Sequence, residues 1–197
     1  MKVLFATNNP AKVRRYVPSL EEQGIEVLTL KDLSLKIDVA ETGKNAIENA
    51  IIKAKAYYNL TKIITIAVDD NLYIEELPEE LQPGTNVRRV NGKRLNDDEM
   101  IDYYTSLVKP YGEKLNAKWV YGMAVYNGKE IKKYSWSKSH FYLVSKPYKE
   151  RNVGYPLDSI SIDPEYNKYF VELTPEEKKS KNDNEQNVIE FIKNSLK

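Results

Sequence analysis

The feature that most constrains this chain is an almost uninterrupted apolar run from Ile63 to Val68 that stops at two adjacent carboxylates, Asp69 and Asp70. Its β-branched residues predict a strand buried on both faces, as in the middle of an α/β sheet. Ligands bind at strand ends in such sheets, and two neighbouring acids there need a cation, a positive substrate group or a proton. The alternative is that the acids only begin a turn, as Asp often does. This stretch alone does not decide between the two.

Length and composition limit the class of protein. The chain has 197 residues, enough for a sizeable core, and we expect a single domain over residues 1–197. Its 30 basic and 29 acidic side chains nearly balance, so no binding to a nucleic-acid polymer or to an anionic membrane is expected. The absence of cysteine, of a membrane-length apolar segment and of a signal-like N-terminus favours a cytoplasmic protein.

The N-terminal stretch predicts a strand, a polar turn and a helix. Residues 3–7 are a short apolar run, Asn8 and Asn9 follow in the turn, and a helical pattern over residues 11–23 ends at Gly24. Such a turn presents backbone N–H groups at the positive end of a helix, where phosphate binds, and Lys12 adds a charge there. Because the turn lacks the glycines of a P-loop, an ordinary connecting loop is the competing interpretation.

A second helix is predicted from Asn45, and apolar residues on nearly all its sides predict that it is buried. Lys53 lies on a stripe of small residues in this helix. Its amine either reaches solvent along the helix surface or contacts an anion inside the protein. Glu41 lies just before the helix, where a carboxylate also stabilises the helix dipole.

The rest of the chain predicts an alternation of strands and helices, with no strong element between Asp70 and Asp97. The expected elements are a strand over residues 24–30, a helix from Asp97 to before Pro110, an antiparallel unit over residues 115–145 with an Asn127-Gly128 turn, a turn at 154–157, a strand at 169–173 and helices from 174 and over 185–196. Asp183 and Gln186 together predict a capping box for the last helix.

Four motifs, in this order along the chain, resemble the inosine triphosphate pyrophosphatase family, whose members hydrolyse non-standard purine nucleoside triphosphates. The motifs are Thr7-Asn8-Asn9-Pro10-Ala11-Lys12, Glu41-Thr42-Gly43 leading into Glu48-Asn49-Ala50-Ile51-Ile52-Lys53-Ala54, Ala67-Val68-Asp69-Asp70, and Pro83-Gly84. The C-terminal half matches in element order, with a looser sequence match. The resemblance implies an α/β fold with a long, curved mixed β-sheet flanked by helices, in two lobes with a central cleft.

The resemblance also implies a reaction and the residues that perform it. Water would attack the α-phosphorus of a nucleoside triphosphate in the presence of Mg²⁺, giving the monophosphate and pyrophosphate. Glu41, Asp69 and Asp70 would bind Mg²⁺, and Asp70 would position or deprotonate the water. The implied substrate-binding residues are Thr7, Asn8, Asn9, Lys12, Lys53, Asn71, Tyr155 and Lys178. A homodimer is expected from the same resemblance.

This chain departs from the family pattern at several positions. Arg15 replaces an acid three residues after the loop lysine, Asn71-Leu72 replaces Ser-Gly, and Val153-Gly154-Tyr155-Pro156 replaces Phe-Gly-Tyr-Asp. Asn182-Asp183-Asn184 replaces Ser-His-Arg, whose last two residues recognise the 6-oxo group of the purine, so cationic donors to a keto oxygen are lost.

The departures leave the base preference open, together with two alternatives to the pyrophosphatase interpretation. One is a weakened family member that binds a nucleotide or a partner without efficient turnover. The other is an enzyme that acts on a different phosphorylated compound, such as a modified pyrimidine nucleotide.

Overall fold

The computed structural model describes residues 1–37, 39–138, 140–180 and 184–197. The chain divides into two compact units. Unit 1 comprises Met1–Asp70, Tyr121–Trp136 and Asp183–Lys197, and unit 2 comprises Asn71–Val120 and Ser137–Asn182. The expectation of a single domain over residues 1–197 stays a prediction.

The strands form a mixed sheet in the order β10-β9-β8-β6-β3-β1-β2, with β7 paired to β6, and a separate hairpin of β4 and β5. Their bounds are β1 Lys2–Phe5, β2 Glu26–Thr29, β3 Thr65–Ile74, β4 Arg89–Val90, β5 Lys93–Arg94, β6 Lys114–Tyr126, β7 Ile131–Ser137, β8 Phe141–Val144, β9 Ser161–Asp163 and β10 Lys168–Tyr169. β1 is parallel to β2 and β3, and β8 is antiparallel to β6 and β9. The predicted mixed α/β fold is therefore confirmed.

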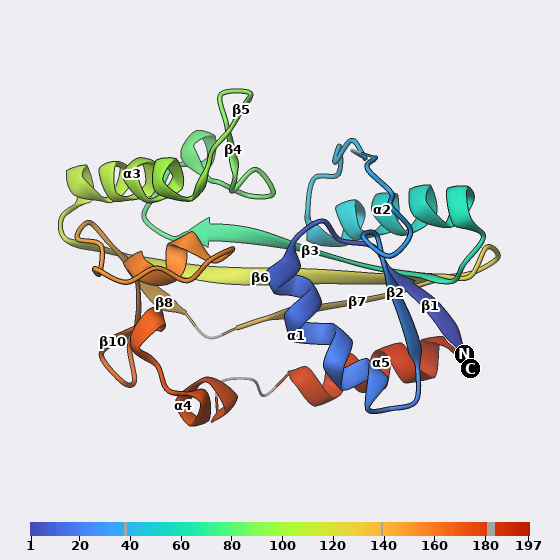
Figure 1. Ribbon diagram of the computed structural model, residues 1–197. Helices are drawn as coiled ribbons and strands as arrows, with labels where there is room; N and C mark the ends of the chain where they lie inside the picture. The colour runs from blue at the N-terminus through green and yellow to red at the C-terminus, as the bar shows by residue number, and fades with distance from the viewer. Residues whose placement is uncertain (38, 139, 181–183) are drawn as a thin grey trace. The chain divides into compact units, whose positions relative to one another are not determined.

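In unit 1, helix α2 (Ala46–Thr61) lies on one face of the strands, and α1 (Pro10–Glu21) and α5 (Glu185–Ser195) lie on the other (Figure 1). α2 approaches β6 closely, because a Cβ at Gly122 would lie 2.4 Å from the backbone nitrogen of Ile47. Alanines on both sides allow the same close packing: Ala50 and Ala54 of the helix and Ala67 and Ala124 of the strands share one buried cluster. The first turn of α2 is thereby held against the sheet.

Unit 2 has its own core. Leu72, Ile74, Leu115, Phe141 and Leu143 of its strands are buried together with the inner face of helix α3 (Asp97–Val108). α3 begins with a capping box in which Asn96 and Glu99 bond to each other's backbone N–H groups. The unit also contains the short helix α4 (Pro175–Ser180) and the 3₁₀ segments Glu79–Leu81, Lys109–Tyr111, Pro156–Ile160 and Phe170–Glu172.

Several sequence-based expectations are wrong. The strand that contains Asp69 and Asp70 does not stop at the acids but continues to Ile74, because Leu72 and Ile74 enter the core of unit 2. The expected strand at 169–173 is mostly a 3₁₀ turn over Phe170–Glu172. The region between Asp70 and Asp97 contains the end of β3 and the β4–β5 hairpin, and β9 was missed.

The structure does not test the capping box expected for the last helix. Asp183 lies outside the described residues, and α5 has Asn184 at its N-cap position, without a capping hydrogen bond from the side chain.

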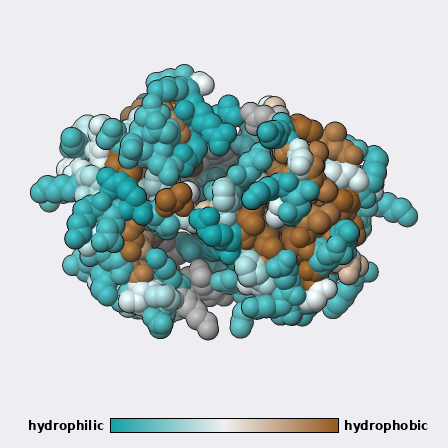
Figure 2. Space-filling model, in the orientation of Figure 1, coloured by the Kyte–Doolittle hydropathy of each residue, from teal (hydrophilic) through white to brown (hydrophobic). Residues whose placement is uncertain are grey.

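The prediction that the second helix is buried is only half right. Ala50, Ala54 and Tyr57 of α2 are buried, but Leu60 is 54% exposed and Lys55 is exposed. Figure 2 shows apolar residues gathered on the side of the molecule where α2 lies in Figure 1.

Within the described ranges, none of the helices has the length and apolar character needed to cross a membrane.

Candidate active site

Three acids and two lysines of unit 1 form a continuous run of ion pairs, which we call the acid–lysine chain: Glu41, Lys53, Asp69, Lys12 and Asp70. Lys53 Nζ lies 3.0 Å from Glu41 Oε1 and 3.2 Å from Asp69 Oδ1. Lys12 Nζ lies 3.8 Å from Asp69 Oδ1 and donates a hydrogen bond to Asp70 Oδ1. Each amine therefore lies between two carboxylates.

Lys12 is positioned by the loop between β1 and α1. The backbone N–H of Asn9 donates to Thr7 Oγ1 (3.2 Å), and the N–H of Ala11 donates to Asn9 Oδ1 (2.9 Å), so Asn9 caps the helix. Pro10 occupies the first turn, where a missing N–H costs nothing. The helix therefore starts at a defined residue, and Lys12 in its first turn points at the acids. Asn8 is exposed in the same loop.

Lys53 and Glu41 are positioned by α2 and the segment before it. Asn45 caps α2 by accepting from the backbone N–H of Glu48 (3.0 Å). Fully buried Asn49 accepts a hydrogen bond from the N–H of Gly43 (2.7 Å), which anchors the segment that carries Glu41. A Cβ at Gly43 would lie 2.6 Å from Asn49 Oδ1, so this anchor requires glycine. Asn49 was not singled out from the sequence, since an Asn within a helical pattern carries no signal of its own.

Burial and ion pairing shift the pKa values of the acid–lysine chain in opposite directions. Burial alone would lower the pKa of Lys12, but the charges of Asp70 and Asp69 outweigh it and raise the pKa above its ordinary value. Burial raises the pKa of Asp69, although Lys53 and Lys12 oppose the shift. Lys53 also donates to the carbonyl oxygen of Val68 (3.2 Å), so its amine is directed inward.

The chemistry of the three acids suits a hard divalent cation, which prefers carboxylate oxygens. Asp69 Oδ2 is buried and has no hydrogen-bond partner among the described residues, so one oxygen remains available as a ligand. In the part of the chain that the structure describes, no three His, Cys, Asp or Glu side chains are grouped so as to hold a metal ion by themselves. The lysine amines account for this spacing, because they lie between the acids.

Two aromatic side chains extend the site beyond the residues expected from the sequence. The Arg15 guanidinium carbon lies 5.0 Å from the centre of the Tyr16 ring and 5.4 Å from that of Tyr121. Burial raises the pKa of the Tyr121 hydroxyl, which is also affected by the charges of Arg15 and Asp70. Sequence patterns could not place Tyr121 here, because it comes from β6, far along the chain.

The remaining expected site residues belong to unit 2. Buried Asn71 donates through Nδ2 to the Tyr73 hydroxyl (3.1 Å), while its Oδ1 is buried without a partner among the described residues. Tyr155 precedes the 3₁₀ segment Pro156–Ile160 and is partly exposed. Lys178 is exposed on α4 and lines a cavity, described next.

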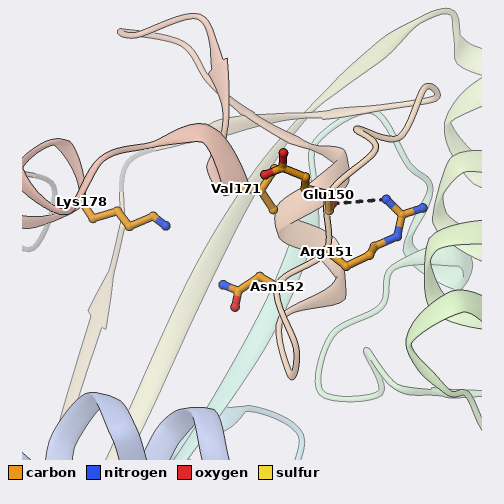
Figure 3. Close-up of a pocket in the computed structure, with 5 residues that line it drawn as sticks. All are labelled: Glu150, Arg151, Asn152, Val171 and Lys178. Atoms are coloured by element: carbon orange, nitrogen blue, oxygen red, sulfur yellow. Dashed lines mark hydrogen bonds between the residues drawn. The ribbon is translucent and has the colours of Figure 1, made fainter.

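A cavity of about 220 Å³ in unit 2 is lined by Glu150, Arg151, Asn152, Val171 and Lys178. In the close-up of this cavity, the Lys178 amine reaches in from one side and the Asn152 amide lies below (Figure 3). Asn152 Nδ2 donates to Asp158 Oδ2 (2.8 Å), which fixes the orientation of the amide. The volume is below the ~300 Å³ at which pockets for drug-sized ligands begin, so the cavity does not enclose a ligand of that size.

Of the triplet 182–184 that replaces the base-reading residues of the family, only Asn184 lies within the described residues, at the N-cap position of α5. The structure therefore does not describe position 183, the other of the two positions expected to recognise the 6-oxo group.

The fold and the acid–lysine chain define an α/β protein whose charged site combines amines that can bind phosphate with carboxylates that can bind a metal. A family model described as the Ham1 family matches residues 3–192. The chain belongs to the Ham1 family.

Individual relatives agree with this assignment. The chain is 32% identical over 193 residues to a dITP/XTP pyrophosphatase of Leptospira interrogans, covering 98% of this chain and 95% of that protein. It is 34% identical over 191 residues to a dITP/XTP pyrophosphatase of Aquifex aeolicus, covering 90% and 88%. The family resemblance expected from the four motifs is therefore confirmed.

Solved structures confirm the fold. The Ham1 protein of Staphylococcus aureus superposes with a TM-score of 0.77 at 24% sequence identity, covering 100% of both chains. A HAM1 protein of Coxiella burnetii gives a TM-score of 0.76 at 24% identity, covering 100% of this chain and 98% of that one.

Proposed function

We propose that this protein is a nucleoside triphosphate pyrophosphatase, which hydrolyses a non-standard purine nucleoside triphosphate to the monophosphate and pyrophosphate. The observation that carries the proposal is the acid–lysine chain, in which Lys12 and Lys53 alternate with Glu41, Asp69 and Asp70. Membership in the Ham1 family supports it, as do relatives named dITP/XTP pyrophosphatase.

In this proposal the substrate rearranges the ion pairs of the site. The amines of Lys12 and Lys53 exchange their carboxylate partners for phosphate oxygens of the substrate, since phosphate accepts the same charge-assisted hydrogen bonds. The Thr7–Asn9 loop lies at the positive end of α1, which favours a phosphate there. Release from the lysines leaves the three carboxylates free to bind metal and water.

Glu41, Asp69 and Asp70 would then hold Mg²⁺, which neutralises charge on the phosphates and so favours departure of pyrophosphate. Asp70 orients the attacking water and accepts its proton. Its side chain is 27% exposed, compared with 11% for Asp69, so Asp70 is the acid that water reaches more easily. Asp69 keeps its buried position as the more constrained ligand.

Asn71, Tyr155 and Lys178 complete the proposed set of substrate-binding residues. The Asn71 amide oxygen and the Lys178 amine can accept from and donate to a nucleotide, respectively. The homodimer belongs to the same proposal, and light scattering of the purified protein tests it.

A panel of nucleoside triphosphates with Mg²⁺, assayed for pyrophosphate release, tests the function. We expect release from dITP or XTP in preference to ATP and GTP, and a loss of about 10²- to 10⁴-fold in the Asp70→Asn variant. A protein that binds these nucleotides but releases no pyrophosphate from any of them would contradict the proposal and favour a binding role.

A further inference from the structure

Arg15 is a cation that the proposed reaction does not yet use, and its side chain is held in place. It follows Lys12 by three residues on α1, so the two side chains share one face of the helix. Its guanidinium group lies within cation–π distance of two rings, those of Tyr16 and Tyr121 (5.0 and 5.4 Å). A side chain held between two rings has already lost most of its conformational entropy, so it loses little more when it binds a ligand.

Tyr121 connects Arg15 with the acid–lysine chain. The tyrosine is only 9% exposed, and its hydroxyl is close enough to Arg15 and to Asp70 to feel both charges. Asp70 in turn accepts a hydrogen bond from Lys12. Arg15, Tyr121, Asp70 and Lys12 are therefore neighbours around the acid that we assign to the attacking water.

The charge of the site favours a further cation. The acid–lysine chain contains three carboxylates and two amines, so one bound Mg²⁺ would bring its net charge only to +1, although its substrate is a polyanion. Arginine is suited to the missing role, because its planar group donates to two phosphate oxygens at once and stays charged at any relevant pH. Arg15 also lies at the position where the sequence departs from the family pattern, with a cation in place of an acid.

We propose that Arg15 is a third phosphate-binding residue of this site, which contacts the pyrophosphate part of the substrate from its place between Tyr16 and Tyr121. The proposal rests on the proposed function, since it assigns Arg15 to the same substrate.

Inorganic tripolyphosphate, which has no base or sugar, is the probe for this role. Its binding to the full chain in the presence of Mg²⁺ is measured by titration calorimetry for the wild type, Arg15→Gln, Arg15→Lys and the control Arg14→Gln. Arg14 is exposed, on the same helix, and carries the same charge. We expect Arg15→Gln to weaken binding about 10- to 100-fold and Arg14→Gln about twofold or less. Arg15→Lys keeps the charge but cannot donate to two phosphate oxygens at once, so its affinity should lie between those of the wild type and Arg15→Gln.

A structural role for Arg15 gives a different result. If the guanidinium only holds the two rings, Arg15→Gln lowers the melting temperature but binds tripolyphosphate as tightly as Arg14→Gln, which would overturn the proposal. If Arg15→Gln does not fold, Arg15→Lys decides, because wild-type affinity in that variant would also contradict a two-oxygen contact. A wild type that binds tripolyphosphate yet hydrolyses no nucleotide would contradict the proposed function. The comparison of Arg15→Gln with Arg14→Gln would still decide whether Arg15 binds phosphate.

Discussion

Lys53 shows what the structure adds at the scale of a single residue. The sequence allowed its amine either to reach solvent or to contact an anion inside the protein. The amine lies against Glu41, Asp69 and the Val68 carbonyl, and the side chain is only 12% exposed, so it contacts anions. What the sequence indicated correctly was the unusual placement of a lysine on a stripe of small residues.

The variant Lys53→Met tests the function of this amine. Methionine keeps the apolar stem but leaves buried Asp69 with only the more distant Lys12, so we expect a loss of about 1–3 kcal/mol in the free energy of unfolding. Loss of a charge-assisted contact to phosphate should lower kcat/KM about 10- to 100-fold. Lys55→Met, an exposed position on the same helix, is the control for both measurements. Unchanged kinetics in Lys53→Met would return Lys53 to a structural role.

A second prediction concerns Asp158 and pH. Burial raises the pKa of its carboxyl, and the Asn152 hydrogen bond and the charges of Lys178 and Lys138 oppose this shift. A raised pKa means that the folded protein holds the proton more tightly than the unfolded chain, so the charged form costs stability above that pKa. Asp158→Asn removes the charge and still offers Asn152 an acceptor. We therefore expect it to melt at a higher temperature than the wild type at pH 7.

The pH dependence of this difference gives the control. The difference in melting temperature should shrink as the pH falls through the raised pKa, and it should vanish well below 3.8, the ordinary value, because Asp158 is then protonated in both the folded and the unfolded state. A difference that grows in acid would show that Asp158 is stabilised as a carboxylate.

At the scale of the elements, sequence patterns located most helices and strands but not their ends. The N-terminal helix, the helix from Asn45, the helix at Asp97 and the Asn127-Gly128 hairpin were all predicted, because caps and turn residues have local signatures. The extent of β3 was not. Two acids within a strand contradict the usual pattern, and only their pairing with Lys12 and Lys53, from other elements, makes the position possible.

The packing of α2 on β6 supports a prediction at this scale. In Gly122→Ala the added Cβ would meet the backbone of Ala46 and Ile47 at 2.4–2.5 Å, so the helix must move. Overpacking of this kind costs about 1–3 kcal/mol, measured by chemical denaturation, and should also lower kcat because α2 carries Lys53. Gly24→Ala is the comparison. Its φ of +74° costs about 1–2 kcal/mol, but nothing lies within 4 Å, so kcat should stay unchanged. Equal kcat in both variants would contradict the role of α2.

At the scale of the whole molecule, the four motifs led to the family because they carry the charged residues of one site. Their order and spacing contain information that no single motif holds. The base-reading half could not be predicted in the same way, since the sequence there departs from the family pattern and Asn182 and Asp183 lie outside the described residues. The contact between Arg15 and Tyr121 could not be predicted, because it depends on packing between distant segments.

The central claim is that Asp70 and its lysine neighbours direct water to the α-phosphorus. Hydrolysis of dITP or XTP in ¹⁸O-labelled water with Mg²⁺, followed by mass analysis of the products, tests it most directly. We predict equal amounts of monophosphate and pyrophosphate, with the label in the monophosphate, and a rate lowered at least about 100-fold in Asp70→Asn. Label in pyrophosphate or inorganic phosphate, or an Asp70→Asn variant as fast as the wild type, would contradict it.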